Sequence, residues 1–571
     1  MAYDLIVRNG TVVDGSGLPG YRADVGVKHG MIAAIGDLRS ERAKESIDAE
    51  GHVVSPGFID GHTHMDAQFF WDPLGTNVCW SGVTSVVMGN CGYTFAPCAA
   101  KDKRLILSNF ERAEEISKAA MEAGVEWTWE TIPEYMDTLD RLPKGINYGT
   151  HVGHSPVRTY VMGERAFTDK ATPDDLEAMK RQVEIGMRAG GLGFSTARSG
   201  SHKTAEGKPV ASRVADWSEI VELTRVMTRL GSGIFQISRG FGSSDPEERR
   251  AERDEIKSLA LDTKVPVTFG STWYRRSKPD YWREQFAMVD EITANGGKAM
   301  IQGTSIWNGS MRSFSTVTSY DKFPVWSEFR KLPLAEQEKG LRDPEMRKKL
   351  VDAVKNSARP NDPGLPNYLL ASVDWNYVYP CHKVMPPHPS VAEIAKERGI
   401  DGLDAFIDLS LEQNLKTFFF SPMFNESEDF LLALMRHPSA TLTFSDAGAH
   451  VSSTINPIQS YTLGYWVRER QAMTLEAAVR KMSFDLAAFW GLEKRGLLRE
   501  GYHADITVFD LATVQPQKPC LVNDLPTGAP RLQYKSDGFL ATIINGQVFM
   551  RNNVHSGAYA GQLMRGALAQ N

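Results

Sequence analysis

Two histidines stand two positions apart in the stretch PGFIDGHTH, directly after a short apolar run. In a β-strand, residues i and i+2 point to the same side, so His62 and His64 can direct two imidazoles at one point. This is chelate geometry for a divalent metal, although isolated His-x-His pairs also occur as ordinary hydrogen-bonding histidines. A metal site therefore requires further ligands from elsewhere in the chain.

Short apolar strands alternate with helical stretches such as ERAEEISKAAMEAG through most of the chain. Eight such units predict an α/β fold, a (β/α)8 TIM-type barrel, in which reactive residues lie at the carboxyl ends of the strands. The candidate strands end near His64, Cys91, His151, Thr196, Ser238, Thr272, Thr304 and Asp446.

The two ends of the chain are rich in strands and turns. Asn9-Gly10 and Asn545-Gly546 each sit between β-rich runs, which is the strongest short-range signal for a hairpin. We expect residues 1–54 and 500–571 to form one small β domain beside a barrel at 55–499.

One interval is much longer than a strand-to-helix connection, the stretch at about 305–415. It is an insertion at the barrel mouth, and two interpretations stand equally: a lid that shapes the substrate site, or an outer decoration away from the chemistry.

Composition excludes several classes of protein. The 571 residues carry 64 Lys and Arg against 70 Asp and Glu, a net charge of −6 with both signs scattered, which argues against a nucleic-acid partner. No apolar stretch approaches the roughly 20 residues that span a bilayer, so no membrane role is expected. The five cysteines form no CxxC pair, which favours a reduced, cytoplasmic protein.

The segment VVSPGFIDGHTHMD resembles the first-strand signature of the amidohydrolase superfamily of metal-dependent hydrolases. The segment SGVTSVVMGNCGYTFAPC is similar to the second-strand region of D-aminoacylases, the N-acyl-D-amino-acid deacylases. The resemblance continues through GTHVGHSPVR, AGGLGFSTAR and TFSDAGAH to the C-terminal strands, and so spans nearly the whole chain. It implies a zinc-centred barrel with a β-sandwich assembled from both termini.

Carried over by position, the resemblance assigns His62 and His64 as metal ligands, Cys91 as the metal-bridging cysteine and Asp446 as the last-strand aspartate. Each fits its role chemically, since a thiolate suits zinc and Asp446 can both ligate and accept a proton from water. The plainer interpretations are that Cys91 is a buried inert thiol and that the carboxylate of Asp446 caps a turn.

The sequence departs from D-aminoacylases at two ligand positions. The resemblance calls for histidines at the ends of the fifth and sixth strands, but no histidine occurs between His202 and His382. Gln236 stands near the first position, and 270–272 (Gly-Ser-Thr) surround the second. Neutral oxygens replace imidazole poorly on zinc, so the sequence favours one zinc ion over two.

The remaining polar candidates surround these ligands. His151, His154, Gln236 and His450 are candidates for substrate contact or for support of the ligands. Arg275, Arg276 or Arg468 are candidates for holding a substrate carboxylate, with surface charge as the plainer interpretation.

The sequence thus predicts a metal-dependent amidohydrolase that cleaves the amide bond of a small-molecule N-acyl amino acid through metal-activated water. Two alternatives remain: a hydrolase of cyclic amides or capped peptides, and a barrel with a degenerate metal site that acts as a binding protein. Whether the chain forms a homo-oligomer is left open.

Overall fold

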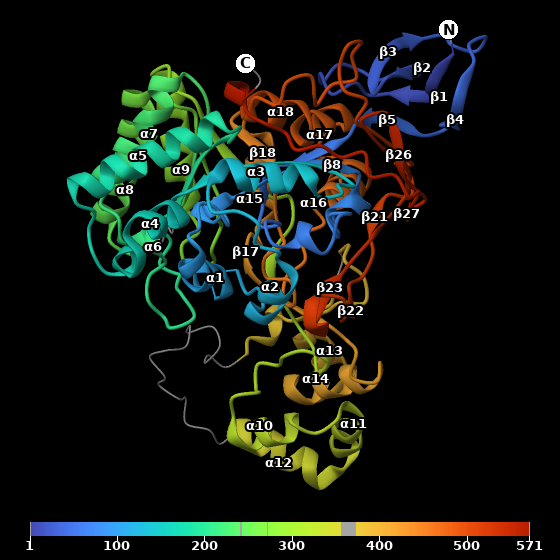
Figure 1. Ribbon diagram of the computed structural model, residues 1–571. Helices are drawn as coiled ribbons and strands as arrows, with labels where there is room; N and C mark the ends of the chain where they lie inside the picture. The colour runs from blue at the N-terminus through green and yellow to red at the C-terminus, as the bar shows by residue number, and fades with distance from the viewer. Residues whose placement is uncertain are drawn as a thin grey trace.

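The computed structural model describes residues 2–112, 114–239, 243–270, 272–355, 373–386 and 388–569. Its centre is a set of parallel strands joined by helices (Figure 1). In chain order these strands are β6 (Phe58–Asp60), β7 (His62–Thr63), β8 (Val83–Met88), β9 (Asn147–Thr150), β10 (Val152–Gly153), β11 (Gly193–Ala197), β12 (Ile234–Ser238), β13 (Val267–Phe269), β14 (Ala299–Gly303), β18 (Ala440–Leu442) and β19 (Phe444–Ala447).

Three parallel ladders connect these strands. One runs β6-β8-β9, the second β10-β11-β12-β13-β14-β18, and the third pairs β19 with β7. A single residue separates β6 from β7, β9 from β10 and β18 from β19, so each ladder continues directly into the next. The last pairing places Phe444 opposite His62, which brings the end of the series back to its beginning.

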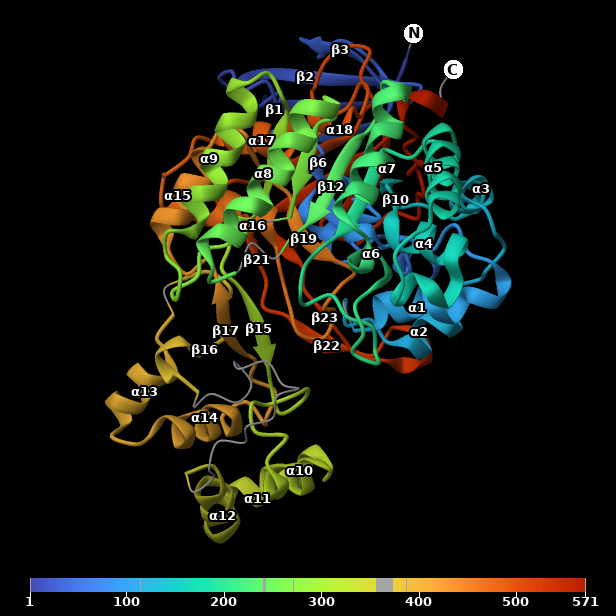
Figure 2. The same cartoon turned by 90° about the vertical axis from the view of Figure 1, so that its left-hand side faces the viewer.

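Helices follow the strands and pack outside them (Figure 2). Local sequence explains their starts: Thr131 and Thr172 each form a capping box with an acidic residue three positions later, Glu134 and Asp175. The helices outside the insertion are α1 (Lys103–Glu111), α2 (Lys118–Gly124), α3 (Ile132–Arg141), α4 (His154–Met162), α5 (Pro173–Arg188), α6 (Ala211–Val214), α7 (Trp217–Leu230), α8 (Pro246–Thr263), α9 (Tyr281–Ala294), α15 (Glu428–Arg436), α16 (Ile458–Tyr461), the π-helix η8 (Thr462–Glu469), α17 (Leu475–Met482) and α18 (Phe484–Trp490).

Strands from both ends of the chain form one nine-stranded sheet, in the order β27-β26-β25-β20-β5-β1-β2-β3 with β4 paired to β1. Both ends of the chain therefore contribute strands to the same sheet. Its strands are β1 (Tyr3–Val12), β2 (Tyr21–Lys28), β3 (Met31–Gly36), β4 (Ala43–Asp48), β5 (Val53–Pro56), β20 (Ile506–Phe509), β25 (Phe539–Ile544), β26 (Gln547–Arg551) and β27 (Val554–His555).

The two predicted Asn-Gly turns have different outcomes. Asn545 and Gly546 both have positive φ and join β25 to β26, so that turn is confirmed. The turn at Asn9-Gly10 is wrong, because β1 continues through both residues. Asn9 has a positive φ at an irregularity in the pairing with β2, and its N–H donates to Asp24 rather than closing a hairpin.

The insertion forms a lobe that extends from the end of the molecule opposite the terminal sheet (Figures 1 and 2). Its helices surround a separate apolar cluster that includes Trp326, Leu350 and Phe406. Its elements are β15 (Asn308–Arg312), α10 (Pro324–Arg330), α11 (Leu334–Arg342), α12 (Pro344–Lys355), β16 (Tyr379–Pro380), α13 (Val391–Arg398), α14 (Gly402–Leu411) and β17 (Phe419–Phe424). Strands β15, β17 and β16 form an antiparallel sheet between the lobe and the parallel strands.

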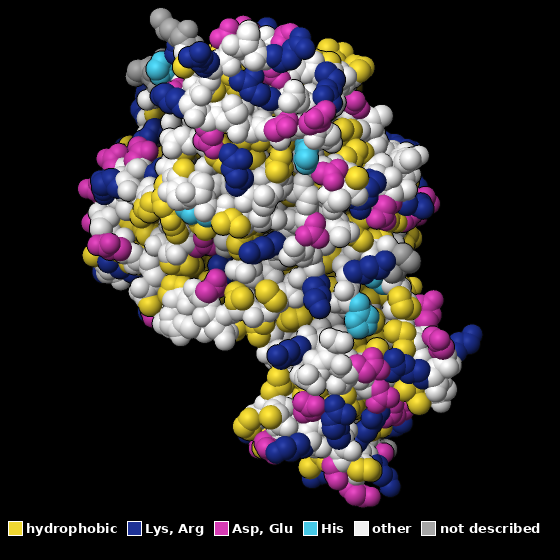
Figure 3. Space-filling model, turned by 90° about the vertical axis from the view of Figure 1, so that its right-hand side faces the viewer, with side chains coloured by type: hydrophobic (Ala, Val, Ile, Leu, Met, Phe, Trp, Pro, Cys, Tyr) yellow, Lys and Arg dark blue, Asp and Glu magenta, His cyan; other side chains and the backbone are white. Residues whose placement is uncertain are grey.

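Lys, Arg, Asp and Glu side chains are interspersed on the face shown in Figure 3, without a continuous field of one sign. Among the described residues, no helix combines the length and the apolar character that crossing a membrane requires.

A buried polar network joins the parallel strands to the terminal sheet. Asn147 of β9 donates to Asp505 over 3.1 Å, and Asn545 donates to Asn147 over 2.8 Å. Asp505 also pairs with Arg495, and both side chains are about 5% exposed. A buried ion pair is expensive to break, because the remaining charge has no partner and no water.

We therefore expect Asp505→Ala to lower the free energy of unfolding by about 3 kcal/mol, since it leaves the Arg495 guanidinium buried and unpaired. Thermal unfolding measures the change. The control is Asp37→Ala, which removes an exposed pair with Arg39 and should lower the free energy of unfolding far less than Asp505→Ala does. Equal effects of the two variants would contradict the network's role.

Candidate metal centre

Four of the predicted ligands meet at the carboxyl ends of the parallel strands. The Sγ of Cys91 lies 3.6 Å from His62 Nε2, and Asp446 Oδ1 lies 3.5 Å from His62 Nε2 and 3.3 Å from His64 Nε2. Ligand atoms of His62, His64 and Cys91 all lie within 4.8 Å of one another. Both imidazoles and the thiol are buried.

Unusual backbone conformations aim two of these side chains. Cys91 and Asp446 have φ values of 57° and 58°, in the left-handed region that non-glycine residues rarely adopt. Gly448, with φ of 94°, lets the chain pass the backbone of His64, where an added Cβ would lie 2.4 Å from the His64 carbonyl oxygen. Such strain persists where the surrounding structure requires it, often at functional sites.

The structure adds one acidic residue that sequence reasoning missed. Glu114 Oε2 lies 3.5 Å from His64 Nε2, and ligand atoms of His64, Glu114 and Asp446 lie within 4.8 Å of one another. The sequence pattern predicted one helix over 111–124, but α1 ends at Glu111 and α2 begins at Lys118. Glu114 lies in the interruption, which helical periodicity alone did not reveal.

The charges of the cluster shift the pKa values of its members. Burial lowers the pKa of His62 to about 4, against the charge of Asp446, so this imidazole is neutral at pH 7 and able to ligate. Burial alone would lower the pKa of His64, but Glu114 and the hydrogen bond to Asp446 raise it well above its usual value. Burial would raise the pKa of Asp446, but His64 and His62 hold it below its usual value.

Two glutamines support the ligands. Gln302 of β14 accepts a hydrogen bond from His62 Nδ1 over 2.7 Å, which leaves the lone pair of Nε2 facing Cys91. Gln236 of β12 accepts from the backbone N–H of Cys91 over 2.8 Å, so the candidate Gln236 lies behind the thiol. Gln302 was missed from sequence; its position near the end of a predicted strand was the available signal.

The three candidate histidines lie in different surroundings. His450 lines the pocket, 3.2 Å from Glu115 and 4.0 Å from Asp446. His154 is buried away from it, with Thr196 at 2.8 Å and Glu219 at 2.8 Å on its two ring nitrogens. His151 is buried, and neither ring nitrogen has a partner among the described residues.

The sixth-strand position at which the resemblance calls for an imidazole is occupied by a glycine. At the sixth strand, Gly270 faces the cluster, and a Cβ there would meet the ring of Phe444 at 3.0 Å and that of His62 at 3.7 Å.

Another histidine, His202, lines the pocket against the ring of Tyr93, and burial lowers its pKa to about 3. His202 was not a candidate from sequence.

The cluster lies at the base of a cavity of about 720 Å³, large enough for a small-molecule substrate. Arg275 lines this cavity, and its guanidinium lies 4.8 Å from the centre of the Phe424 ring. Among the described residues, Arg275 has no carboxylate partner, and burial lowers its pKa. Arg276 instead pairs with Glu426, and Arg468 donates to the Val514 carbonyl.

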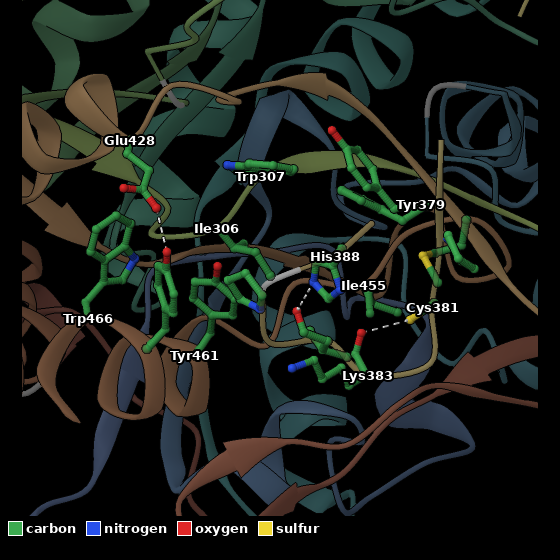
Figure 4. Close-up of a pocket in the computed structure, with 16 residues that line it drawn as sticks. Ile306, Trp307, Tyr379, Cys381, Lys383, His388, Glu428, Ile455, Tyr461 and Trp466 are labelled. Atoms are coloured by element: carbon green, nitrogen blue, oxygen red, sulfur yellow. Dashed lines mark hydrogen bonds between the residues drawn. The ribbon is translucent and has the colours of Figure 1, made fainter. Parts of the chain in front are cut away.

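A second, smaller pocket of about 80 Å³ is lined by apolar and aromatic side chains, among them Met311 of β15 and Phe420 of β17 (Figure 4). Met311 lines both cavities, whereas Trp307 and Tyr379 line only the smaller one. Its carboxylate, Glu428, already accepts hydrogen bonds from Tyr465 and Arg470. The groups capable of hydrolysis therefore gather in the larger cavity.

Comparison with known proteins gives a match over most of the chain. The model of the Amidohydrolase family matches residues 45–336 and 400–550. D-aminoacylase of Alcaligenes xylosoxydans xylosoxydans is 28% identical over 571 residues, 98% of this chain and 97% of that protein. N-acyl-D-glutamate deacylase of the same organism is 28% identical over 519 residues, 90% of this chain and 88% of that protein.

Two solved structures share the fold. A D-aminoacylase crystal structure is 22% identical, with a TM-score of 0.64, over 99% of this chain and all of that chain. N-acyl-D-glutamate deacylase of Bordetella bronchiseptica, solved with zinc and a phosphonate inhibitor, is 23% identical with a TM-score of 0.65 and the same coverage. At this identity the likeness concerns the fold.

We expect Gln302→Leu to weaken metal binding about 10- to 100-fold, because His62 loses the acceptor that fixes its orientation. Titration of the metal-free protein with Zn²⁺ measures the affinity. The matched control is Gln413→Leu, an exposed glutamine, which should bind like the wild type. Unchanged affinity in Gln302→Leu would exclude this support.

Proposed function

The chain belongs to the amidohydrolase family, and from this membership we propose a metal-dependent hydrolase that cleaves the amide bond of N-acyl amino acids, of the N-acyl-D-amino-acid deacylase type. The observation that carries the proposal is the meeting of His62, His64, Cys91 and Asp446 at the base of one cavity. The similarity to deacylases over nearly the whole chain supports the reaction class.

We propose that these four residues hold zinc, one ion rather than two. The donor set fits: two imidazoles, of which His62 is held neutral, a thiol and an ionised carboxylate. The lack of imidazoles at Gln236 and Gly270 supports a single ion. When bound, such an ion supplies Lewis acidity that polarises the carbonyl group of the amide.

Asp446 accepts a proton from the attacking water and passes it to the leaving nitrogen. Its pKa, held below the usual range by the two histidines, keeps the carboxylate ionised at neutral pH. His450 lies 4.0 Å from the second carboxylate oxygen of Asp446, beyond hydrogen-bonding distance, and is itself held by Glu115.

Arg275 binds the carboxylate of the amino acid. The Arg275 guanidinium lines the cavity without an acidic partner among the described residues, so it can pair with an anionic group of the substrate. Trp273, Phe424 and Phe444 line the same cavity and provide apolar contact for the acyl group.

We further propose that the parallel strands close into a (β/α)8 barrel at 55–499, with a β-sandwich formed by 1–54 and 500–571. The continuation of each ladder into the next supports the barrel, and the shared terminal sheet supports the second domain. The insertion at about 305–415 borders the cavity through β15, which supports a role in shaping it. All five cysteines are free, which fits action in the cytoplasm.

The direct test is release of free amino acid from N-acetyl-D-amino acids by protein loaded with Zn²⁺, with the L-enantiomers, a hydantoin and a capped dipeptide as comparison substrates. Hydrolysis of D-substrates supports the proposal. Turnover of the hydantoin or dipeptide alone favours the other hydrolases, and metal-loaded protein without any turnover favours a binding protein.

Replacing the proton acceptor should separate chemistry from binding. We expect Asp446→Asn, measured at saturating Zn²⁺ with metal content verified, to lower kcat about 100- to 10,000-fold with a small change in KM. Asp321→Asn is the control, because Asp321 lines the cavity but pairs with Arg330. Wild-type kcat in Asp446→Asn would remove this residue from the base role.

Removal of the Arg275 guanidinium should affect substrate binding. We expect Arg275→Gln to raise KM about 10- to 100-fold for N-acetyl-D-amino acids with little change in kcat, since one charged hydrogen bond is lost. An N-acyl amine without the carboxylate should be hydrolysed equally by both proteins. The same KM for wild type and variant would assign the carboxylate to another residue.

A further inference from the structure

Glu114 stands out among the buried acidic groups, because it comes from the segment between α1 and α2 rather than from a strand end. Its side chain is 2% exposed. One carboxylate oxygen faces His64, and the other, Oε1, has no hydrogen-bond partner among the described residues. A buried carboxylate with an open coordination position is costly unless a cation or a donor satisfies it.

The two strand-end positions cannot supply the missing ligands. Gln236 Oε1 is already engaged by the backbone N–H of Cys91, over 2.8 Å. Gly270 has no side chain, and the ring of Phe444 occupies the space that a Cβ would enter. Any further donor to the ion would therefore come from a different part of the structure.

We propose that Glu114 is a direct metal ligand in this protein, entering from the helix interruption in place of the absent imidazoles. The inference rests on the proposed function, since it concerns the same ion. His64 belongs both to the triad with His62 and Cys91 and to the triad with Glu114 and Asp446. Asp446 Oδ1 lies close to the Nε2 atoms of both His62 and His64, so the two triads adjoin each other.

The added carboxylate changes the character of the site. Two imidazoles, one thiolate and two carboxylates form a donor set with more oxygen and more negative charge than histidine-rich zinc sites. Oxygen ligands suit harder ions, so the site should accept Mn²⁺, Fe²⁺ or Co²⁺ as well as Zn²⁺.

The neighbouring residue provides a matched control. Glu115 also lines the cavity, but its Oε2 lies 3.2 Å from His450 Nδ1 and 2.9 Å from Ser453 Oγ. Its side chain is 52% exposed. Glu114→Gln and Glu115→Gln thus remove the same charge at adjacent positions, of which only the first faces the proposed ion.

The experiment compares metal affinity in these two variants by competition with a chelator, and metal content by elemental analysis after dialysis. We expect Glu114→Gln to bind Zn²⁺ at least about 100-fold more weakly, above the loss typical of an indirect supporting residue, and Glu115→Gln to bind within a few-fold of wild type. The absorption spectrum of bound Co²⁺ should change in Glu114→Gln alone, because the coordination number falls.

A second measurement uses the unaltered protein and covers the case in which Glu114→Gln does not fold. Anomalous scattering from metal-loaded crystals should place the ion about 2.0–2.2 Å from a Glu114 oxygen. An ion held by His62, His64, Cys91 and Asp446 with Glu114 beyond bonding distance, or wild-type affinity in Glu114→Gln, overturns this inference and leaves the proposed function intact. Failure of the wild type to bind any divalent ion would refute both.

Discussion

Burial of opposite charges in a small volume is the constraint on which this molecule's centre depends. Cys91 and Glu114 are buried together with two imidazoles, and Asp446 lies beside them with its side chain 17% exposed. Without a cation, the positive charge on His64 balances the carboxylates, which is the origin of its raised pKa. A divalent ion would take over that balance, so binding would be accompanied by release of a proton.

The structural support of the ligands is distributed over many strands. His62 is oriented by β14 through Gln302, and the backbone of Cys91 is fixed by β12 through Gln236. Asp446 sits in β19, which pairs with β7, the strand that begins at His62. The local His-x-His motif sets the spacing of His62 and His64, whereas the positions of Cys91 and Asp446 relative to them follow from the spacing of the parallel strands.

The sequence identified the residues that are tied to strand ends, because periodicity and the family resemblance both mark those positions. His62, His64, Cys91 and Asp446 were found in this way, and the structure brings them together. Glu114 was missed, since a glutamate in a helical pattern carries no sign that the helix is interrupted there. The error at Asn9-Gly10 has a related cause. This turn-prone pair forms an irregularity inside the long strand β1, because pairing with β2 on both sides of it outweighs the preference of Asn-Gly for a turn.

The hairpin of β22 (Cys520–Val522) and β23 (Arg531–Gln533) reaches from the C-terminal region to the floor of the site. The N–H of Leu532 donates to the Val451 carbonyl, and Arg531 pairs with Asp72. The loop that follows Asp446 is therefore held by residues that the ribosome makes some 80 positions later. A nascent chain could fold many of its helices during synthesis, but the loop after Asp446 would gain these contacts only after the hairpin had emerged from the ribosome.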